Sequence, residues 1–208
     1  MLPGFFLAVT LIELTPGPNM GYLTLVASRW GRRAGLATVL GITCGLTLYM
    51  LAAVAGLGEV FLRVTWLYAI LRWAGVGYLL FLAFETWRGD TETSPGAAPA
   101  TPPNRRLFTR GLVANLLNPK AAVFYVALLP GFTNPAWGAP ASQALALGVI
   151  HVGVSVAVHS GIVLAAGGAR GRVESWTAGL GRRWLDRILA AGLAAVALWL
   201  AWETSGLS

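Results

Sequence analysis

The sequence contains few ionisable side chains and a single cysteine. Of its 208 residues, 15 are Lys or Arg, 8 are Asp or Glu and 2 are His, whereas 56% are apolar. A soluble domain carries far more charge than this, so the composition excludes an ordinary soluble protein. Cys44 lies in an apolar stretch and cannot form a disulfide within the chain, so we interpret it as a packing residue. No metal-ligand, nucleophile or phosphate-loop motif is present, and we expect neither enzymatic activity nor a cofactor.

Apolar runs occupy most of the chain instead. A helix needs roughly 20 residues to cross about 30 Å of hydrocarbon. Windows of this kind fall at residues 3–28, 35–57, 66–87, 108–131, 142–167 and 186–204. Residues 89–107 are rich in Pro, Ala and Thr and predict a flexible linker. We therefore predict an all-α membrane protein, a single transmembrane domain of six helices in two halves, residues 1–88 and 108–208.

The net charge of +7 comes from arginines that cluster between the apolar runs. Cytoplasmic loops of membrane proteins are enriched in Lys and Arg, so this pattern predicts topology and a bilayer, and it does not suggest nucleic acid. The side opposite these clusters carries only Arg63 and Arg72, and we therefore expect both termini outside. The arginines placed in the cytoplasm are Arg29, Arg32, Arg33, Arg88, Arg105, Arg106, Arg110, Arg170, Arg172, Arg182, Arg183 and Arg187.

Helix-breaking motifs interrupt two of the predicted spans at matching places. Residues 15–19, Thr-Pro-Gly-Pro-Asn, lie in the first span, and Asn118-Pro119 lies in the fourth. Proline has no amide hydrogen, so the first motif should free the carbonyls of Ile12 and Leu14. Backbone freed at this depth is tolerated only where it is buried in protein or lines a cavity. Paired breaks are therefore typical of a transport site near the bilayer midplane.

Each break should also begin a half-helix. Asn19 and Asn118 are candidate N-caps, and Pro119 would occupy the first helical position. A helix N-terminus has unpaired amides and a partial positive charge, which suits the carboxylate of a small solute. Because three spans per half reverse the direction of entry into the membrane, the breaks would be symmetry mates of an inverted repeat. The alternative is a pair of proline kinks that serve packing alone.

Glu13 and Lys120 are the only carboxylate and ammonium that we place deep in the hydrocarbon. Burial of either charge costs a few kcal/mol or more, so each should face the bundle interior. Glu13 could hold a substrate ammonium, take up a proton or do both, and Lys120 could hold a substrate carboxylate. The alternative is a structural ion pair between them. Glu85 and Arg88 have the spacing of an ordinary solvated pair and are assigned no function.

His151, Ser155 and His159 recur at intervals of four in the fifth span and form one polar stripe. We expect the stripe to face inward, where histidines could relay protons or bind a soft metal. Hydrogen bonds to neighbouring helices without any function are an equal alternative, and two ligands do not make a metal site. In the second span, Gly41 and Gly45 predict close contact with another helix.

Four motifs occur along the chain: residues 15–19, the turn at 31–36 (Gly-Arg-Arg-Ala-Gly-Leu), residues 77–80 (Gly-Tyr-Leu-Leu) and residues 115–122 (Asn-Leu-Leu-Asn-Pro-Lys-Ala-Ala). Together they resemble the lysine exporter (LysE/RhtB) family of bacterial amino-acid efflux proteins. The resemblance covers almost the full length. It implies export of an amino acid or close derivative across the bacterial inner (plasma) membrane, driven by the proton gradient.

The chain departs from this family at two places. Many members carry Asp where this chain has Asn19, so a protonation role at that position would move to Glu13. The two histidines of the fifth span do not belong to the family pattern. A proton relay through His151 and His159 therefore rests on the physical argument alone.

We expect an alternating-access proton antiporter for an amino acid. A divalent-metal exporter that uses His151 and His159 and a membrane scaffold without transport activity are the alternatives, and glycine-rich faces could serve a homo-oligomer or only the fold. The candidate proton-coupling residues are Glu13, His151 and His159. The candidate substrate-binding residues are Glu13, Pro16, Gly17, Pro18, Asn19, Asn115, Asn118, Pro119 and Lys120.

Overall fold

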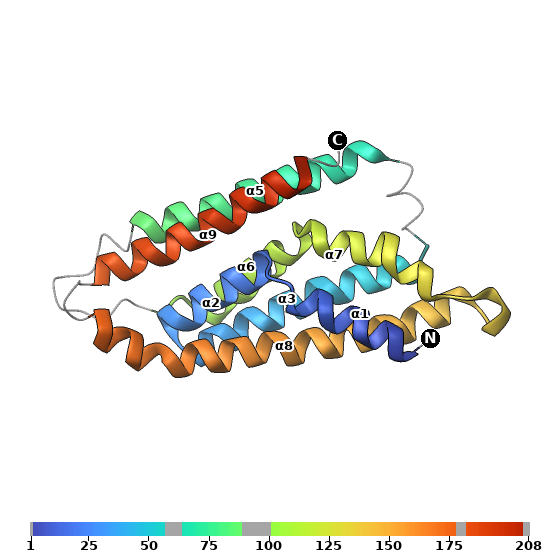
Figure 1. The fold of residues 1–208 in the computed structure, drawn as a ribbon, viewed down its shortest axis with the longest axis horizontal. Helices are drawn as coiled ribbons and strands as arrows, with labels where there is room; N and C mark the ends of the chain where they lie inside the picture. Colours follow the sequence, from blue (N-terminus) through green and yellow to red (C-terminus); the bar gives the residue numbers. More distant parts are fainter. Residues whose placement is uncertain (1, 57–63, 89–100, 178–181, 206–208) are drawn as a thin grey trace.

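A computed structural model describes residues 2–56, 64–88, 101–177 and 182–205. All regular elements within these ranges are helical, as predicted (Figure 1). The α-helices are α1 (Leu2–Leu14), α2 (Pro18–Trp30), α3 (Arg32–Val54), α5 (Thr65–Arg88), α6 (Asn104–Leu116), α7 (Pro119–Val123), α8 (Pro140–Thr177) and α9 (Arg182–Ser205). A π-helical turn, η1 (Phe124–Leu128), and two 3-10 turns, η2 (Leu129–Phe132) and η3 (Pro135–Trp137), lie between α7 and α8.

Several of these helices are long and apolar enough to cross a membrane. Among the described residues, Arg32–Val54, Ala69–Arg88 and Pro140–Ala169 meet this requirement alone. Asn104–Leu116 and Pro119–Phe132 meet it together, as one span bent by 54°. The chain is thus a multi-pass helical protein, while the count of six spans and the inverted repeat remain predictions.

The predicted linker at 89–107 is too long at its C-terminal end. Residues 89–100 lie outside the described part of the chain, but α6 begins at Asn104, directly after Pro103. Leu107 is fully buried in a core cluster with residues of α2, α5 and α9. Burial of this apolar side chain favours the helix over the flexible linker that composition alone predicted.

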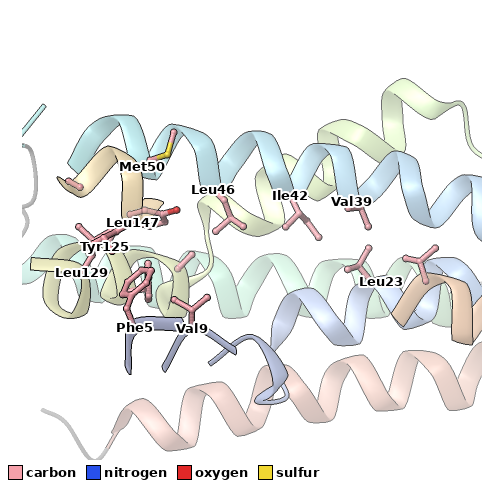
Figure 2. Packing of buried hydrophobic residues seen from close by; sticks show 14 of the residues in the cluster. Phe5, Val9, Leu23, Val39, Ile42, Leu46, Met50, Tyr125, Leu129 and Leu147 are labelled. Atoms are coloured by element: carbon pink, nitrogen blue, oxygen red, sulfur yellow. The ribbon is translucent and has the colours of Figure 1, made fainter. Parts of the chain in front are cut away.

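Two hydrophobic clusters hold the helices together. One joins α1, α2, α3, α8 and the segment from α7 to η2, and Figure 2 shows part of it. The other joins α2, α3, α5, α6 and α9. In Figure 1, α5 and α9 run side by side, and α3 packs against both α6 and α8.

Glycines allow the backbones of α3 and α6 to approach closely. A Cβ at Gly41 would collide with the carbonyl of Phe108, and one at Gly45 would lie 2.7 Å from Nδ2 of Asn115. The close contact predicted for these two glycines is therefore confirmed. Gly75 of α5 allows a similarly close approach, because a Cβ there would collide with the carbonyl of Leu117. α6 therefore lies close against α3, and Leu117, which follows α6, lies close against α5.

The chain reverses repeatedly between the two ends of the molecule. In Figure 1 the turn between α2 and α3, the end of α5, the end of α8 and the start of α9 all lie at the left. The start of α1 and the η3 segment lie at the right. The helices α2, α5 and α8, which contain the ends of the first, third and fifth predicted spans, therefore end on the same side of the molecule.

Candidate functional site

The first predicted break is present between Leu14 and Pro18. α2 begins at Pro18, and its N-cap is Gly17, which provides no side-chain hydrogen bond. The prediction that Asn19 caps this helix is therefore wrong. Proline tolerates the first helical position because it has no amide to satisfy, and this places Asn19 one residue further inside the helix.

The carbonyl of Ile12 is not left free, contrary to expectation. It accepts a hydrogen bond from the backbone N–H of Thr15 at 3.1 Å, because the last turn of α1 tightens at its end. The backbone group that the break offers to the rest of the protein is instead the carbonyl of Thr15. The ammonium of Lys120 donates to this oxygen at 2.9 Å.

The second break lies between α6 and α7, where Asn118 and Pro119 have the predicted roles. The side-chain oxygen of Asn118 accepts from the backbone N–H of Lys120 at 3.1 Å, and Pro119 is the first residue of α7. The hydroxyl of Tyr49 donates to the carbonyl of Leu116 at 2.7 Å and so satisfies the end of α6. α7 has only five residues before the π-helical turn, so its dipole is short.

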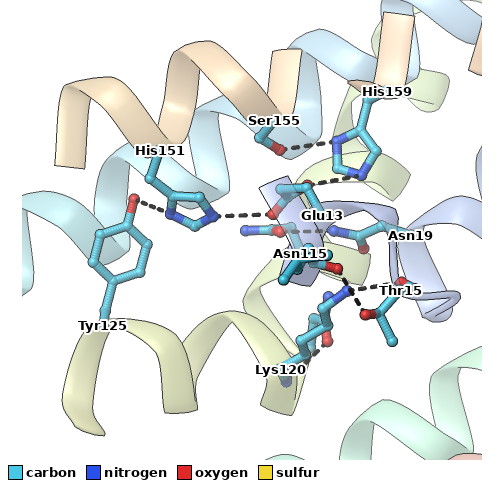
Figure 3. Close-up of polar contacts among 11 residues, drawn as sticks. Glu13, Thr15, Asn19, Asn115, Lys120, Tyr125, His151, Ser155 and His159 are labelled. Carbon is cyan, nitrogen blue, oxygen red and sulfur yellow. Dashed lines mark hydrogen bonds and ion pairs between the residues drawn. The ribbon is translucent and has the colours of Figure 1, made fainter. Parts of the chain in front are cut away.

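The two breaks lie against each other. Nδ2 of Asn19 donates to Oδ1 of Asn115 at 2.9 Å, across 96 positions in the sequence. Both side chains are buried. Together with the bond from Lys120 to Thr15, this contact joins the first break to the second at two points (Figure 3).

Glu13 lies between the two histidines of α8, as Figure 3 shows. Its Oε1 is 3.0 Å from Nε2 of His151, and its Oε2 is 3.6 Å from Nε2 of His159. The other ring nitrogens also have partners, because Nδ1 of His151 is 3.0 Å from the hydroxyl of Tyr125 and Nδ1 of His159 is 3.0 Å from the hydroxyl of Ser155. All three residues of the polar stripe are buried, so the prediction that it faces inward is confirmed.

Glu13, His151 and His159 together could bind one proton beyond those that their hydrogen bonds require. With Glu13 ionised, neutral His151 can donate from Nε2 to the carboxylate and accept at Nδ1 from Tyr125. Neutral His159 can accept at Nδ1 from Ser155, while its Nε2 lies 3.6 Å from the carboxylate. A further proton would bind at Nδ1 of either ring, which faces the hydroxyl of Tyr125 or Ser155, and the charge that it adds to the ring would be offset by the nearby carboxylate of Glu13. Two imidazoles and a carboxylate therefore lie close together at the cavity, and an imidazole has an unperturbed pKa near physiological pH.

A small cavity lies between the two breaks. Its volume is about 20 Å³, room for about one water molecule and too small for an amino acid. Ile12, Met20, Leu46, Ala121 and Phe124 form its apolar wall. The predicted site residues that line it are Glu13, Gly17, Asn19, Asn115, Asn118, Lys120, His151 and His159. The prolines at 16, 18 and 119 shape the breaks but are not among the lining residues.

Sequence reasoning missed two tyrosines of this site. Tyr125 bonds to His151, Tyr49 bonds to the end of α6, and their rings stack with centroids 6.2 Å apart. Phe124 covers His151, with ring centroids 3.8 Å apart. A tyrosine within an apolar span needs a partner for its hydroxyl, and this signal could have identified both residues.

Comparison with known proteins identifies the family of this chain. The chain is 33% identical over 175 residues to the homoserine/homoserine lactone efflux protein of Salmonella typhimurium, which covers 84% of this chain and 82% of that protein. It is 29% identical over 147 residues to the threonine efflux protein of Escherichia coli K12, which covers 64% of this chain and 71% of that protein. No solved structure matches it. Because residues 10–204 match the LysE type translocator family, the chain belongs to this family and is a membrane transporter, not an enzyme.

Proposed function

We propose that this protein exports an amino acid or a close derivative across the bacterial inner membrane in exchange for protons. The contact between the two helix breaks around one charged cavity carries the proposal. The relatives named above are efflux proteins for homoserine, its lactone and threonine, which favours a small polar amino acid as the substrate.

The cavity has opposite charges for the two ends of a zwitterion. Lys120, which lines the cavity beside Asn118, would bind the substrate carboxylate. An ammonium group has three N–H donors, so Lys120 can donate to a substrate carboxylate while it still donates to the carbonyl of Thr15. Glu13 would bind the substrate ammonium on the other side of the cavity.

Proton coupling follows from competition for the charge of Glu13. A substrate ammonium and an extra proton on His151 or His159 would both place positive charge beside the same carboxylate. Each therefore weakens the binding of the other, and this linkage is reciprocal. Protons entering from outside would release the amino acid there, and deprotonation in the cytoplasm would restore the site.

Access would alternate by movement at the two breaks. The cavity must widen before an amino acid fits, and broken helices can bend without disrupting regular hydrogen bonds. We further propose six spans in an inverted repeat with both termini outside. This orientation is supported because α2, α5 and α8 end on the same side of the molecule, and most arginines lie at or after these helix ends in the sequence.

A divalent-metal exporter is the weaker candidate. Among the described residues, no group of three or more His, Cys, Asp or Glu side chains is placed to hold a metal ion. Lys120 would also repel a cation in the cavity.

Transport by purified protein in liposomes tests the proposal. A panel of radiolabelled amino acids is offered with and without an imposed pH gradient, and Lys120→Ala is compared with the parent. We expect gradient-dependent movement of at least one amino acid, with a half-saturation concentration at least about tenfold higher in the variant. Absence of movement for every amino acid, with folded and oriented protein, would refute the proposal and make divalent metals the next substrates to test.

A further inference from the structure

Two arginines lie on aromatic rings where α5 ends and α9 begins. The two helices run side by side, and both of these ends lie at the left in Figure 1. The guanidinium of Arg88 lies over the ring of Phe84, with Cζ 4.7 Å from the ring centroid. The guanidinium of Arg187 contacts a ring of each helix, 5.5 Å from the centroid of Trp87 and 5.6 Å from that of Trp184. We call these five residues the α5–α9 cluster.

The two positive charges of the cluster are neighbours at the end of a membrane span. Phe84 and Trp87 are three residues apart on α5 and therefore share one face of this helix. Arg88 covers the first of these rings, and Arg187 contacts the second. Arg88 is also the last residue of the candidate span Ala69–Arg88. The cluster thus lies where the hydrocarbon of a bilayer gives way to its headgroups, the level that tryptophan prefers.

The acidic side chains next to these arginines are bound elsewhere. Glu85 pairs with two arginines of α6, and Asp186 pairs with Arg29 of α2 at 3.3 Å. Among the described residues, neither Arg88 nor Arg187 has an ion-pair or hydrogen-bond partner. An aromatic ring attracts the charge of a guanidinium but offers no oxygen acceptor. The N–H donors of both arginines therefore remain available to an anion outside the protein.

An apolar surface continues from the cluster along both helices. Phe81 of α5 and Ile188 of α9 lie about one turn deeper in the predicted spans, and each is 55% exposed. Exposed apolar side chains at this depth of a multi-pass membrane protein contact lipid acyl chains. A ligand that matches the whole surface therefore has a negative charge next to a long apolar tail. A free anion would use the arginines alone.

We propose that the α5–α9 cluster binds an anionic phospholipid of the surrounding bilayer. The headgroup phosphate accepts hydrogen bonds from Arg88 and Arg187, because the planar guanidinium matches the geometry of phosphate oxygens. The acyl chains lie over Phe81 and Ile188. Basic sites between membrane helices bind anionic headgroups in this way. The lipid joins α5 to α9, which belong to different halves of the predicted repeat, and its binding does not depend on which substrate is transported.

Lipid titration of the purified protein, followed by native mass spectrometry, tests this inference. Phosphatidylglycerol is the anionic probe, and phosphatidylcholine with the same acyl chains is the zwitterionic comparison. We expect the parent protein to bind phosphatidylglycerol at least about tenfold more tightly, because the choline group brings a positive charge towards the two arginines. Arg88→Gln combined with Arg187→Gln should remove this preference.

Two further double variants serve as controls. Arg33→Gln combined with Arg105→Gln removes the same charge from two other exposed arginines and should keep the parent preference. Arg88→Lys combined with Arg187→Lys keeps the charge of the cluster but removes the planar guanidinium groups. Its preference for phosphatidylglycerol should lie between those of the parent and the glutamine variant.

Each measurement has an outcome that contradicts the proposed lipid site. Equal affinity of the parent for the two lipids would overturn it. A folded Arg88→Gln/Arg187→Gln variant that keeps the preference would show that the anionic lipid binds elsewhere. An equal loss in the Arg33→Gln/Arg105→Gln variant would show that net charge alone sets the preference. If the glutamine variant of the cluster does not fold, a full parent preference in the lysine variant would overturn the role of the guanidinium groups.

Discussion

Replacement of Glu13 by glutamine removes the charge that the proposed substrate and proton share. The side chain keeps its shape, but its contacts at 3.0 Å to His151 and 3.6 Å to His159 are no longer made by an anion. Loss of one charge-assisted hydrogen bond in a buried site costs about 1.5–3 kcal/mol. We therefore expect binding of the substrate ammonium to weaken by roughly tenfold to a hundredfold.

Two transport modes separate the two roles of Glu13. Exchange of labelled for unlabelled amino acid at equal pH needs substrate binding alone, whereas export against a gradient also needs proton coupling. Glu13→Gln should raise the half-saturation concentration in exchange by the factor above and should abolish export driven by a pH gradient.

A matched carboxylate provides the control for this experiment. Glu85 pairs with Arg106 and Arg110 between α5 and α6 and does not line the cavity. Glu85→Gln should therefore keep gradient-driven export. If folded Glu13→Gln also exports at the parent rate, the assignment of substrate and proton to this carboxylate is incorrect.

Three further predictions concern the histidines, the lysine and the helix contacts. His151→Gln combined with His159→Gln should leave exchange at equal pH measurable but remove its acceleration by a pH gradient, which paired assays on one liposome preparation would show. Lys120→Ala should raise the half-saturation concentration for exchange by at least about tenfold through loss of the carboxylate contact, and an unchanged value would contradict that role. Gly41→Ala should lower the thermal unfolding temperature in detergent, because overpacking costs about 1–3 kcal/mol. Gly161→Ala, where a Cβ meets nothing within 4 Å, should not lower it.

Local chemistry explains which features of the site could be predicted from sequence. Proline lacks an amide wherever it occurs, so the breaks near Pro18 and Pro119 follow from the residues themselves. A four-residue interval places side chains on one helix face in any fold, and this is why the inward stripe of His151 and His159 was predicted correctly.

Contacts between helices were harder to predict, because they depend on how each helix is rotated about its axis. Glu85 has the spacing to pair with Arg88 along α5, yet its carboxylate faces α6 and binds two arginines there. Arg88 instead lies over the ring of Phe84, 4.7 Å from its centroid. Asn19 similarly turns across to Asn115 and does not cap its own helix. Spacing within one segment contains no information about these partners.

The contacts between the two breaks are polar, and this suits a site that must open and close. The bonds from Asn19 to Asn115 and from Lys120 to Thr15 have donors and acceptors that a substrate can also use. Apolar packing at the same place would lose its full contact energy when the breaks separate. In the proposed cycle, substrate groups replace or supplement these bonds as the cavity widens, so the cost of opening is offset only when a substrate with the right groups is bound. Selection of the substrate and movement of the broken helices would then depend on the same side chains.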